Sequence, residues 1–78
     1  MLFAIGSYVY LKSHPYTHKG TIAGGSMLEG NMRYIFHLDE RITSVSCPDR
    51  YVYEWDLERG ERPDEEEIRR INRLVVNA

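Results

Sequence analysis

Aromatic side chains are the most frequent groups with binding chemistry in this sequence. There are six tyrosines and one tryptophan in 78 residues. Most of them recur at every second position of two short runs, as Tyr8, Tyr10, Tyr51, Tyr53 and Trp55. Exposed aromatic rings stack on proline rings, on cations or on nucleic-acid bases. The alternative is that some rings fill the core with their hydroxyls hydrogen-bonded at its edge, and we favour this for Tyr34 and Tyr53.

A loop over residues 13–20 holds the next group of interest. His14 and His18 flank a Pro-Tyr-Thr run. Imidazoles four residues apart bind metal well on a helix, but Pro15 predicts a loop here, and no Cys-x-x-Cys pair accompanies them. We therefore expect two surface histidines, no metal site and no cofactor. Tyr16, which lies between them, joins the candidate ligand-binding residues.

Groups for nucleophilic catalysis are sparse. Cys47 is the single cysteine and has no identifiable base beside it, so it is expected to be a small buried hydrophobe. Ser44 and Ser46 lie in no Gly-x-Ser-x-Gly elbow. The glycines at 20, 24, 25 and 30 are not followed by the Lys-Ser/Thr helix start of a phosphate loop. We expect no enzyme and no catalytic residues.

Charge is unevenly divided along the chain. The net charge is −2, but residues 1–38 carry +2 and residues 39–78 carry −4. A nucleic-acid-binding domain is usually basic overall, and this one is not. A local basic strip remains open in the first half, with the candidate phosphate contacts Lys12, Lys19 and Arg33.

Length and composition limit the fold. The chain has room for one domain with a small core. The lone cysteine fits a reducing compartment. The apolar run at residues 1–5 is too short for a signal peptide or a membrane span. We therefore expect a soluble cytoplasmic protein with no membrane partner.

Hydrophobic periodicity predicts five short strands and one helix. The strands are expected over residues 7–12, 21–23, 32–38, 42–47 and 51–55, with a flexible turn over 24–31 and a tight turn over 56–58. The core-facing positions are predicted to be Val9, Leu11, Ile22, Met32, Tyr34, Phe36 and Leu38. A helix is predicted over residues 63–76, capped by Asp64.

These elements favour a mainly β fold, a five-stranded SH3-like antiparallel barrel with a C-terminal α-helix. In such a barrel the first and last strands run close together, so the paired tyrosines and Trp55 would form one patch. A short helix is marginal by itself. Its apolar stripe must dock on the barrel or on another subunit, and consists of Ile68, Ile71, Leu74 and Val75.

The sequence resembles bacterial SH3-like barrels of the KOW/Tudor type. The resemblance rests on the run from Ile5 to Ser13, on Lys19-Gly20-Thr21-Ile22, and on the closing run from Tyr51 to Glu58. It covers about residues 5–58 and implies the same barrel fold in a bacterial or mobile-element protein.

A weaker similarity is to the plasmid-encoded type II dihydrofolate reductases, which are SH3-like barrels active as tetramers around a pore. Residues 6–13 and 20–22 are similar to their early strands. Their pore motif, Val-Gln-Ile-Tyr, is absent, and the corresponding region reads Asp49-Arg50-Tyr51-Val52-Tyr53.

The sequence thus predicts a small non-enzymatic binding module that docks a protein or peptide partner through its aromatic residues. A nucleic-acid-binding barrel is the first alternative, and an oligomeric reductase of the type II kind is the second. A homo-oligomer is left open, because small barrels bury little surface by themselves.

Overall fold

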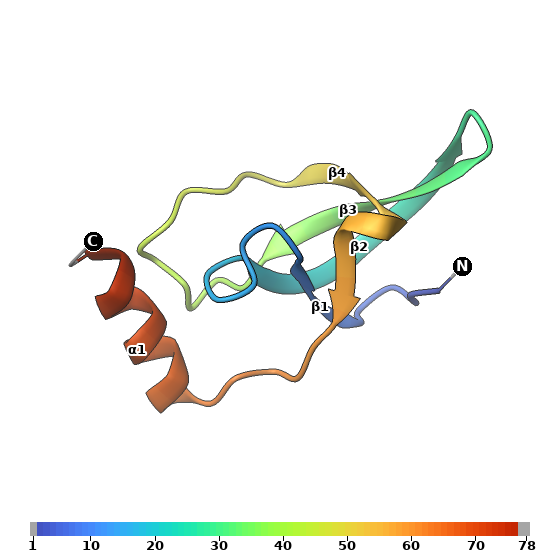
Figure 1. The fold of residues 1–78 in the computed structure, drawn as a ribbon. Helices are drawn as coiled ribbons and strands as arrows, with labels where there is room; N and C mark the ends of the chain where they lie inside the picture. Colours follow the sequence, from blue (N-terminus) through green and yellow to red (C-terminus); the bar gives the residue numbers. More distant parts are fainter. Residues whose placement is uncertain (1, 77–78) are drawn as a thin grey trace.

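The computed structural model describes residues 2–76, although the side chains of residues 75 and 76 are not described. Five strands, a short 3₁₀ helix and one α-helix follow each other along the chain (Figure 1). In order they are β1 (Tyr8–Leu11), β2 (Lys19–Leu28), β3 (Asn31–Leu38), β4 (Arg50–Tyr53), η1 (Glu54–Asp56), β5 (Leu57–Arg59) and α1 (Glu65–Val76).

The strands form one antiparallel sheet in the order β4-β3-β2-β1-β5. The mainly β fold with a C-terminal helix is confirmed. The sheet does not close, because β4 and β5 occupy its opposite edges. The sheet is therefore not a closed barrel. The two edge strands are nevertheless consecutive in the chain, with only η1 between them.

The core lies on one face of the sheet and follows the predicted alternation. Val9 and Leu11 of β1, Ile22 of β2, and Tyr34 and Phe36 of β3 are almost completely buried. Met32 and Leu38 pack against this cluster at its margins. Apolar side chains at every second strand position thus lie on one face of the sheet, and their burial there stabilises the fold.

The segment over residues 24–31 was expected to be a flexible turn, and this is wrong. β2 continues through it to Leu28, and the turn consists of Glu29 and Gly30, both with positive φ. The register shifts between Ile22 and Gly24, so one residue bulges out of the ladder. A glycine fits at position 25 because a larger residue there would collide with the side chains of Met32 and Tyr34 of β3. The resulting hairpin projects beyond the rest of the sheet (Figure 1).

The strand predicted over residues 42–47 is also absent. Its backbone is held by the helix instead of by a neighbouring strand. The amide oxygen of Asn72 accepts hydrogen bonds from the backbone N–H groups of Thr43 and Ser44, at 3.0 and 3.2 Å. The Asn72 amide nitrogen donates to the carbonyl of Arg41 at 3.1 Å. Tertiary contacts therefore override the β propensity of this segment.

The end of the sheet differs from the prediction as well. The strand expected over residues 51–55 ends at Tyr53, and residues 54–56 form η1. The predicted tight turn over 56–58 is mostly strand β5, which pairs with β1. The number of strands was thus right, but the fifth one is β5 and carries no aromatic residue.

Helix α1 begins two residues later than predicted. Asp64 caps it as expected, since its Oδ1 accepts the backbone N–H of Glu67 at 2.8 Å. Ile68 and Ile71 are buried against Ile42. Leu74 is 58% exposed, and the side chain of Val75 lies outside the described residues.

The helix lies at the end of the sheet opposite the β2–β3 hairpin tip (Figure 1). Within residues 2–76 no helix is long and apolar enough to cross a membrane.

Candidate functional site

Aromatic side chains line up on the outer face of β4 and on η1. Val52 is buried in the core, so its neighbours Tyr51 and Tyr53 point to the opposite face of the sheet. The ring of Trp55 stacks on that of Tyr53, with centroids 4.4 Å apart and planes inclined by 5°. Tyr51 is 51% exposed and Trp55 is 55% exposed. We call Tyr51, Tyr53 and Trp55 the aromatic platform.

An arginine extends the aromatic platform across β3. Arg33 is the register partner of Tyr53, so both side chains rise on the same face. The Arg33 guanidinium lies 4.0 Å from the centroid of the Tyr51 ring, and its Nε donates to Ser26 Oγ at 3.2 Å. This cation–π contact fixes a flat, positively charged group beside the exposed rings.

A pocket of about 330 Å³ lies beside the aromatic platform. The end of β1 forms its other side, because the backbone N–H of Lys12 donates to the carbonyl of Asp56 at 2.9 Å. Its lining residues are Leu11, Ser13, Arg50, Tyr51, Val52, Tyr53 and Asp56. The pocket therefore offers two tyrosine rings and one group of each charge sign at its rim.

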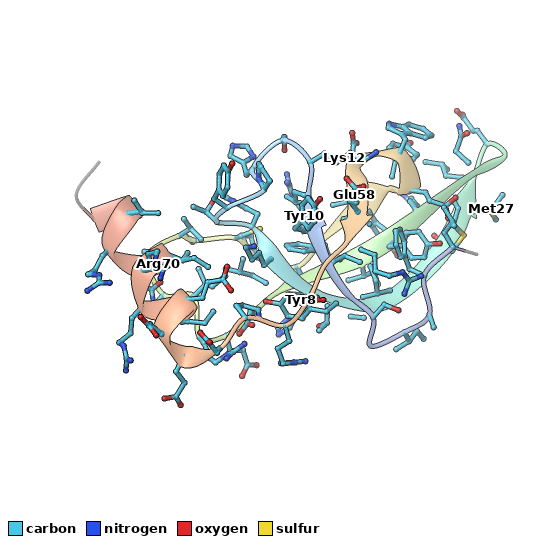
Figure 2. The ribbon with its side chains drawn as sticks, turned by 60° about the horizontal axis from the view of Figure 1, so that its bottom comes forward. Tyr8, Tyr10, Lys12, Met27, Glu58 and Arg70 are labelled. Atoms are coloured by element: carbon cyan, nitrogen blue, oxygen red, sulfur yellow. The ribbon has the colours of Figure 1, made fainter. Side chains whose placement is uncertain are left out.

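Tyr8 and Tyr10 lie elsewhere on the sheet. They belong to β1, which β2 and β3 separate from β4. Both are half-buried, and Tyr10 lies beside Glu58 of β5 and below the amine of Lys19, 5.9 Å from its ring centroid (Figure 2). The expected single patch thus separates into the aromatic platform and a pair on β1. The reason is that β5, not the strand with the aromatic residues, pairs with β1.

The three candidate phosphate contacts do not form a continuous strip. The carbonyl of Lys19 accepts the backbone N–H of Asp39, the residue after β3, at 2.8 Å, so Lys19 lies beside the end of that strand. Arg33 belongs to β3 and lies six residues before Asp39. At 3.3 Å per residue, this places it about 20 Å from the position of Lys19. Lys12 is exposed beside Asp56. Lys19 and Arg33 each lie over a tyrosine ring.

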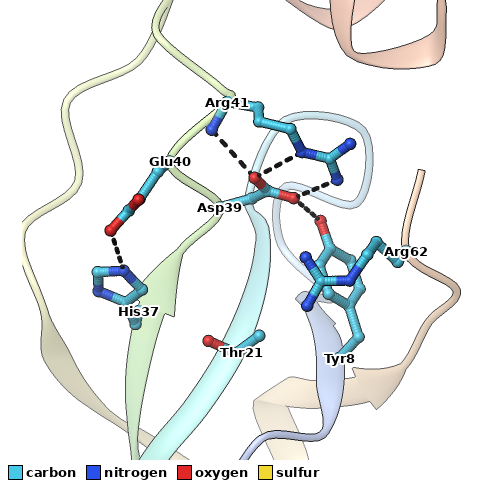
Figure 3. A pocket seen from close by; sticks show the side chains of 7 residues that line it. All are labelled: Tyr8, Thr21, His37, Asp39, Glu40, Arg41 and Arg62. Carbon is cyan, nitrogen blue, oxygen red and sulfur yellow. Dashed lines mark hydrogen bonds and ion pairs between the residues drawn. The ribbon is translucent and has the colours of Figure 1, made fainter. Parts of the chain in front are cut away.

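A second pocket of about 300 Å³ was not anticipated from the sequence (Figure 3). At its centre the buried carboxylate of Asp39 accepts hydrogen bonds from Arg41 Nη2 at 2.8 Å, from Arg41 Nε at 3.1 Å and from the Tyr8 hydroxyl at 2.7 Å. Arg62 lies over the Tyr8 ring at 5.2 Å. The only sequence signal was an Asp-x-Arg spacing, which also fits a polar turn.

Opposing effects act on the ionisation of Asp39. Burial by itself raises its pKa, but the hydrogen bonds from Arg41 and Tyr8 and the charge of Arg41 outweigh burial and bring the pKa to about 2. Burial and the same carboxylate raise the pKa of Tyr8 above its usual range. The centre of this pocket is therefore a fixed ion pair with a neutral phenol, and the pairing neutralises the charge of Arg41.

His37 also lines the second pocket. Its Nδ1 lies 2.7 Å from Asp49 Oδ1, and its Nε2 lies 3.5 Å from Glu40 Oε1. The hydrogen bond with Asp49 raises the pKa of His37, burial opposes the rise, and Glu40 adds to it. A histidine held between two carboxylates carries its proton to a higher pH than a free imidazole.

The other predicted residues have simple placements. Tyr16 is 75% exposed in the loop between β1 and β2. Cys47 is half-buried and packs against the core cluster. Tyr34 is a core residue, as favoured, and its hydroxyl bonds Glu54 and the amides of Leu2 and Phe3. No cluster of three or more His, Cys, Asp or Glu suited to a metal ion occurs in the described part of the chain.

No family model, curated protein or solved structure matches this chain.

Proposed function

We propose that this protein is a small binding module that docks an extended segment of a protein partner on the aromatic platform. The observation that supports the proposal is the outward stack of Tyr53 and Trp55 beside an exposed Tyr51. Large rings on the surface of a small domain cost solubility unless a partner covers them. Proline rings of an extended peptide stack well on such rings and lose little entropy when they bind.

The neighbouring pocket supports an extended ligand. It lies between the aromatic platform and the end of β1, and Arg50 and Asp56 stand at its rim. β4 is an edge strand, so its outer backbone groups are free of ladder bonds. A peptide lying there would meet rings for its apolar groups and charges of both signs for its polar ones.

We also propose that the sheet belongs to the SH3-like barrel type. A flat sheet of five strands would hold its edges about 19 Å apart, at about 4.8 Å per strand spacing. Here three residues of η1 join β4 to β5. Such a short link supports a strongly curled sheet whose edges approach each other at this end.

Selection from a display library of random peptides tests the platform. We expect proline-containing peptides that bind the native protein and bind the Y51A/W55A variant at least about tenfold more weakly, because buried aromatic anchors dominate such interfaces. Tyr16→Ala is the matched control, since Tyr16 is more exposed than either ring but lies outside the platform. Peptides that bind the native and Y51A/W55A proteins equally would overturn the proposal.

A single-stranded nucleic acid is the second candidate ligand. It is favoured by the Arg33 guanidinium over Tyr51, since bases stack on aromatic rings while a cation contacts the phosphate. Binding to mixed oligonucleotides should then weaken steeply with salt. Arg33→Gln should reduce it, whereas Arg70→Gln, at an exposed position of helix α1, should not. Absence of binding at low salt would eliminate this candidate.

A further inference from the structure

The loop between β1 and β2 contains one α-turn, from His14 to His18. The backbone N–H of His18 donates to the carbonyl of His14 at 3.0 Å, which is the hydrogen-bond spacing of an α-helix. Pro15 does not prevent this, because it occupies the first position of the turn, where no N–H is needed. Two further bonds fix the turn to the end of β1, from His14 N–H to the Leu11 carbonyl and from Leu11 N–H to the His18 carbonyl.

This turn brings the two imidazoles together. Residues four apart lie on the same side of a helical turn. The ring centroids of His14 and His18 are 4.7 Å apart, and the ring planes are inclined by 46°, so the rings are not stacked face to face. A metal at about 2.1 Å from each nitrogen places the centres of two rings about 4.5–5.2 Å apart, for bond angles of about 90–110°. The observed separation lies within that range.

The same nitrogen is occupied on both rings. His14 Nδ1 lies 2.9 Å from Ser13 Oγ, and His18 Nδ1 lies 2.8 Å from Thr17 Oγ1. Each hydroxyl belongs to the residue directly before its histidine. Metal-ligating histidines ordinarily use one ring nitrogen for the metal and the other for a hydrogen bond that fixes the ring. Both Nε2 atoms are thus left for a ligand.

The surroundings of His18 disfavour its charged form. Burial, the neighbouring His14 and the charge of Arg50 lower the pKa of His18. A neutral imidazole is the form that binds a metal. Arg50 also repels a cation, which limits the affinity.

We propose that His14 and His18 form a two-histidine site for a divalent transition metal, bound through the two Nε2 atoms. Imidazole nitrogens select Cu²⁺, Ni²⁺ and Zn²⁺ over Mg²⁺ and Ca²⁺. With two protein ligands, water or a donor from a partner completes the coordination sphere. Metal bound in this way exchanges readily.

Zinc ion alone is the probe for the test. In the native protein, Zn²⁺ should shift the imidazole ¹⁵N resonances of His14 and His18 in NMR spectra at neutral pH and leave those of His37 unchanged. In calorimetry, H14Q and H18Q should each weaken Zn²⁺ binding by at least about tenfold, since losing even an outer-shell partner costs about 10–100-fold. His37→Gln is the matched control, as the third histidine lies outside the turn.

Three outcomes would overturn the proposal. The first is the absence of saturable Zn²⁺ binding by the native protein. The second is binding that the H14Q/H18Q double variant retains. The third is a shift confined to His37. The NMR measurement needs no variant, so a loss of folding in either substitution leaves the test intact.

Discussion

At the residue scale, Asp39 organises the polar end of the sheet. It follows β3 directly, and its side chain bonds Tyr8 of β1 and Arg41 of the next turn (Figure 3). A buried carboxylate is stable only when it is paired and hydrogen-bonded, and Asp39 meets both conditions. The charge therefore links β1 to the turn after β3, 31 residues further along the chain.

This pairing predicts a dependence of stability on acid. The pKa of Asp39 is about 2 in the folded protein, against an ordinary value of 3.8. The stabilisation is thus present above about pH 4 and is lost as the pH falls towards 2. Asp39→Asn should lower the free energy of unfolding at pH 7 by about 2 kcal/mol and flatten its fall between pH 4 and pH 2.

Urea denaturation at several pH values measures this effect. Glu61→Gln removes an exposed carboxylate from the segment before α1 and serves as the control, with little expected change. An Asp39→Asn protein that keeps the native slope below pH 4 would contradict the assignment.

His37 gives a second prediction at this scale. Its pKa is raised chiefly by the hydrogen bond with Asp49. Asp49→Asn should therefore lower the pKa of His37 towards its ordinary value of 6.5. Glu40→Gln should lower it less, because that contact is 3.5 Å long and the Asp49 contact is 2.7 Å long. An NMR titration of the His37 imidazole measures both, and equal shifts in the two variants would count against the stated order.

At the scale of elements, close backbone approach explains one of the glycines. A Cβ at Gly20 of β2 would collide with the carbonyl group of His37, 2.8 Å from its carbon, and lie 2.9 Å from the Cα of Leu38. At Gly24 of the same strand, the nearest atom is the Ile35 Cδ1 at 3.4 Å. Backbone atoms of a paired strand cannot move aside, whereas the end of an isoleucine side chain can.

Gly20→Ala should therefore destabilise the protein by about 3 kcal/mol or more, through strain between β2 and β3. Gly24→Ala is the matched control and should change stability by less than about 1 kcal/mol, since the added methyl group fits at van der Waals distance. Thermal denaturation of both variants checks the contrast. Equal losses would contradict the close approach of β3 to β2 at Gly20.

Local patterns predicted the strands only where one face is apolar. The alternation through β1 and β3 identified Val9, Leu11, Tyr34 and Phe36 as core residues, and all four are buried. The same reasoning failed over residues 42–47, because the groups that hold this backbone come from Asn72, about thirty positions away. No local pattern carries that information.

The candidate sites show the same limit. Alternation placed Tyr51 and Tyr53 on one face, and this is confirmed, but the preference for Tyr53 as a core residue was wrong, because Val52 is the residue of β4 that faces the core. Which strand is hydrogen-bonded to theirs is a matter of topology: it is β3, whereas β1 pairs with β2 and β5. The segment around Pro15 is a loop, as predicted, but the turn inside it that brings His14 and His18 together was missed.

At the scale of the whole molecule, the core has two parts. The larger cluster lies within the sheet, and the smaller one joins Ile42 to Ile68 and Ile71 of α1. Leu38 packs against both. The molecule is elongated, 40 by 21 by 17 Å, with the helix at one end. A 12-residue helix is not stable by itself, so α1 depends on the smaller cluster.

This division predicts two different responses to truncation of an isoleucine. Ile71→Ala removes about 2–5 kcal/mol of packing from the smaller cluster, which is enough to release α1 while the sheet keeps its own core. Hydrogen exchange should then accelerate in the amides of α1 and remain slow in β1, β2 and β3. Ile22→Ala removes similar packing from the larger cluster. Because the smaller cluster packs against Leu38 of the sheet, exchange should then accelerate in the amides of both the sheet and α1. If Ile71→Ala accelerated exchange equally in the sheet and the helix, the two clusters would form a single cooperative unit.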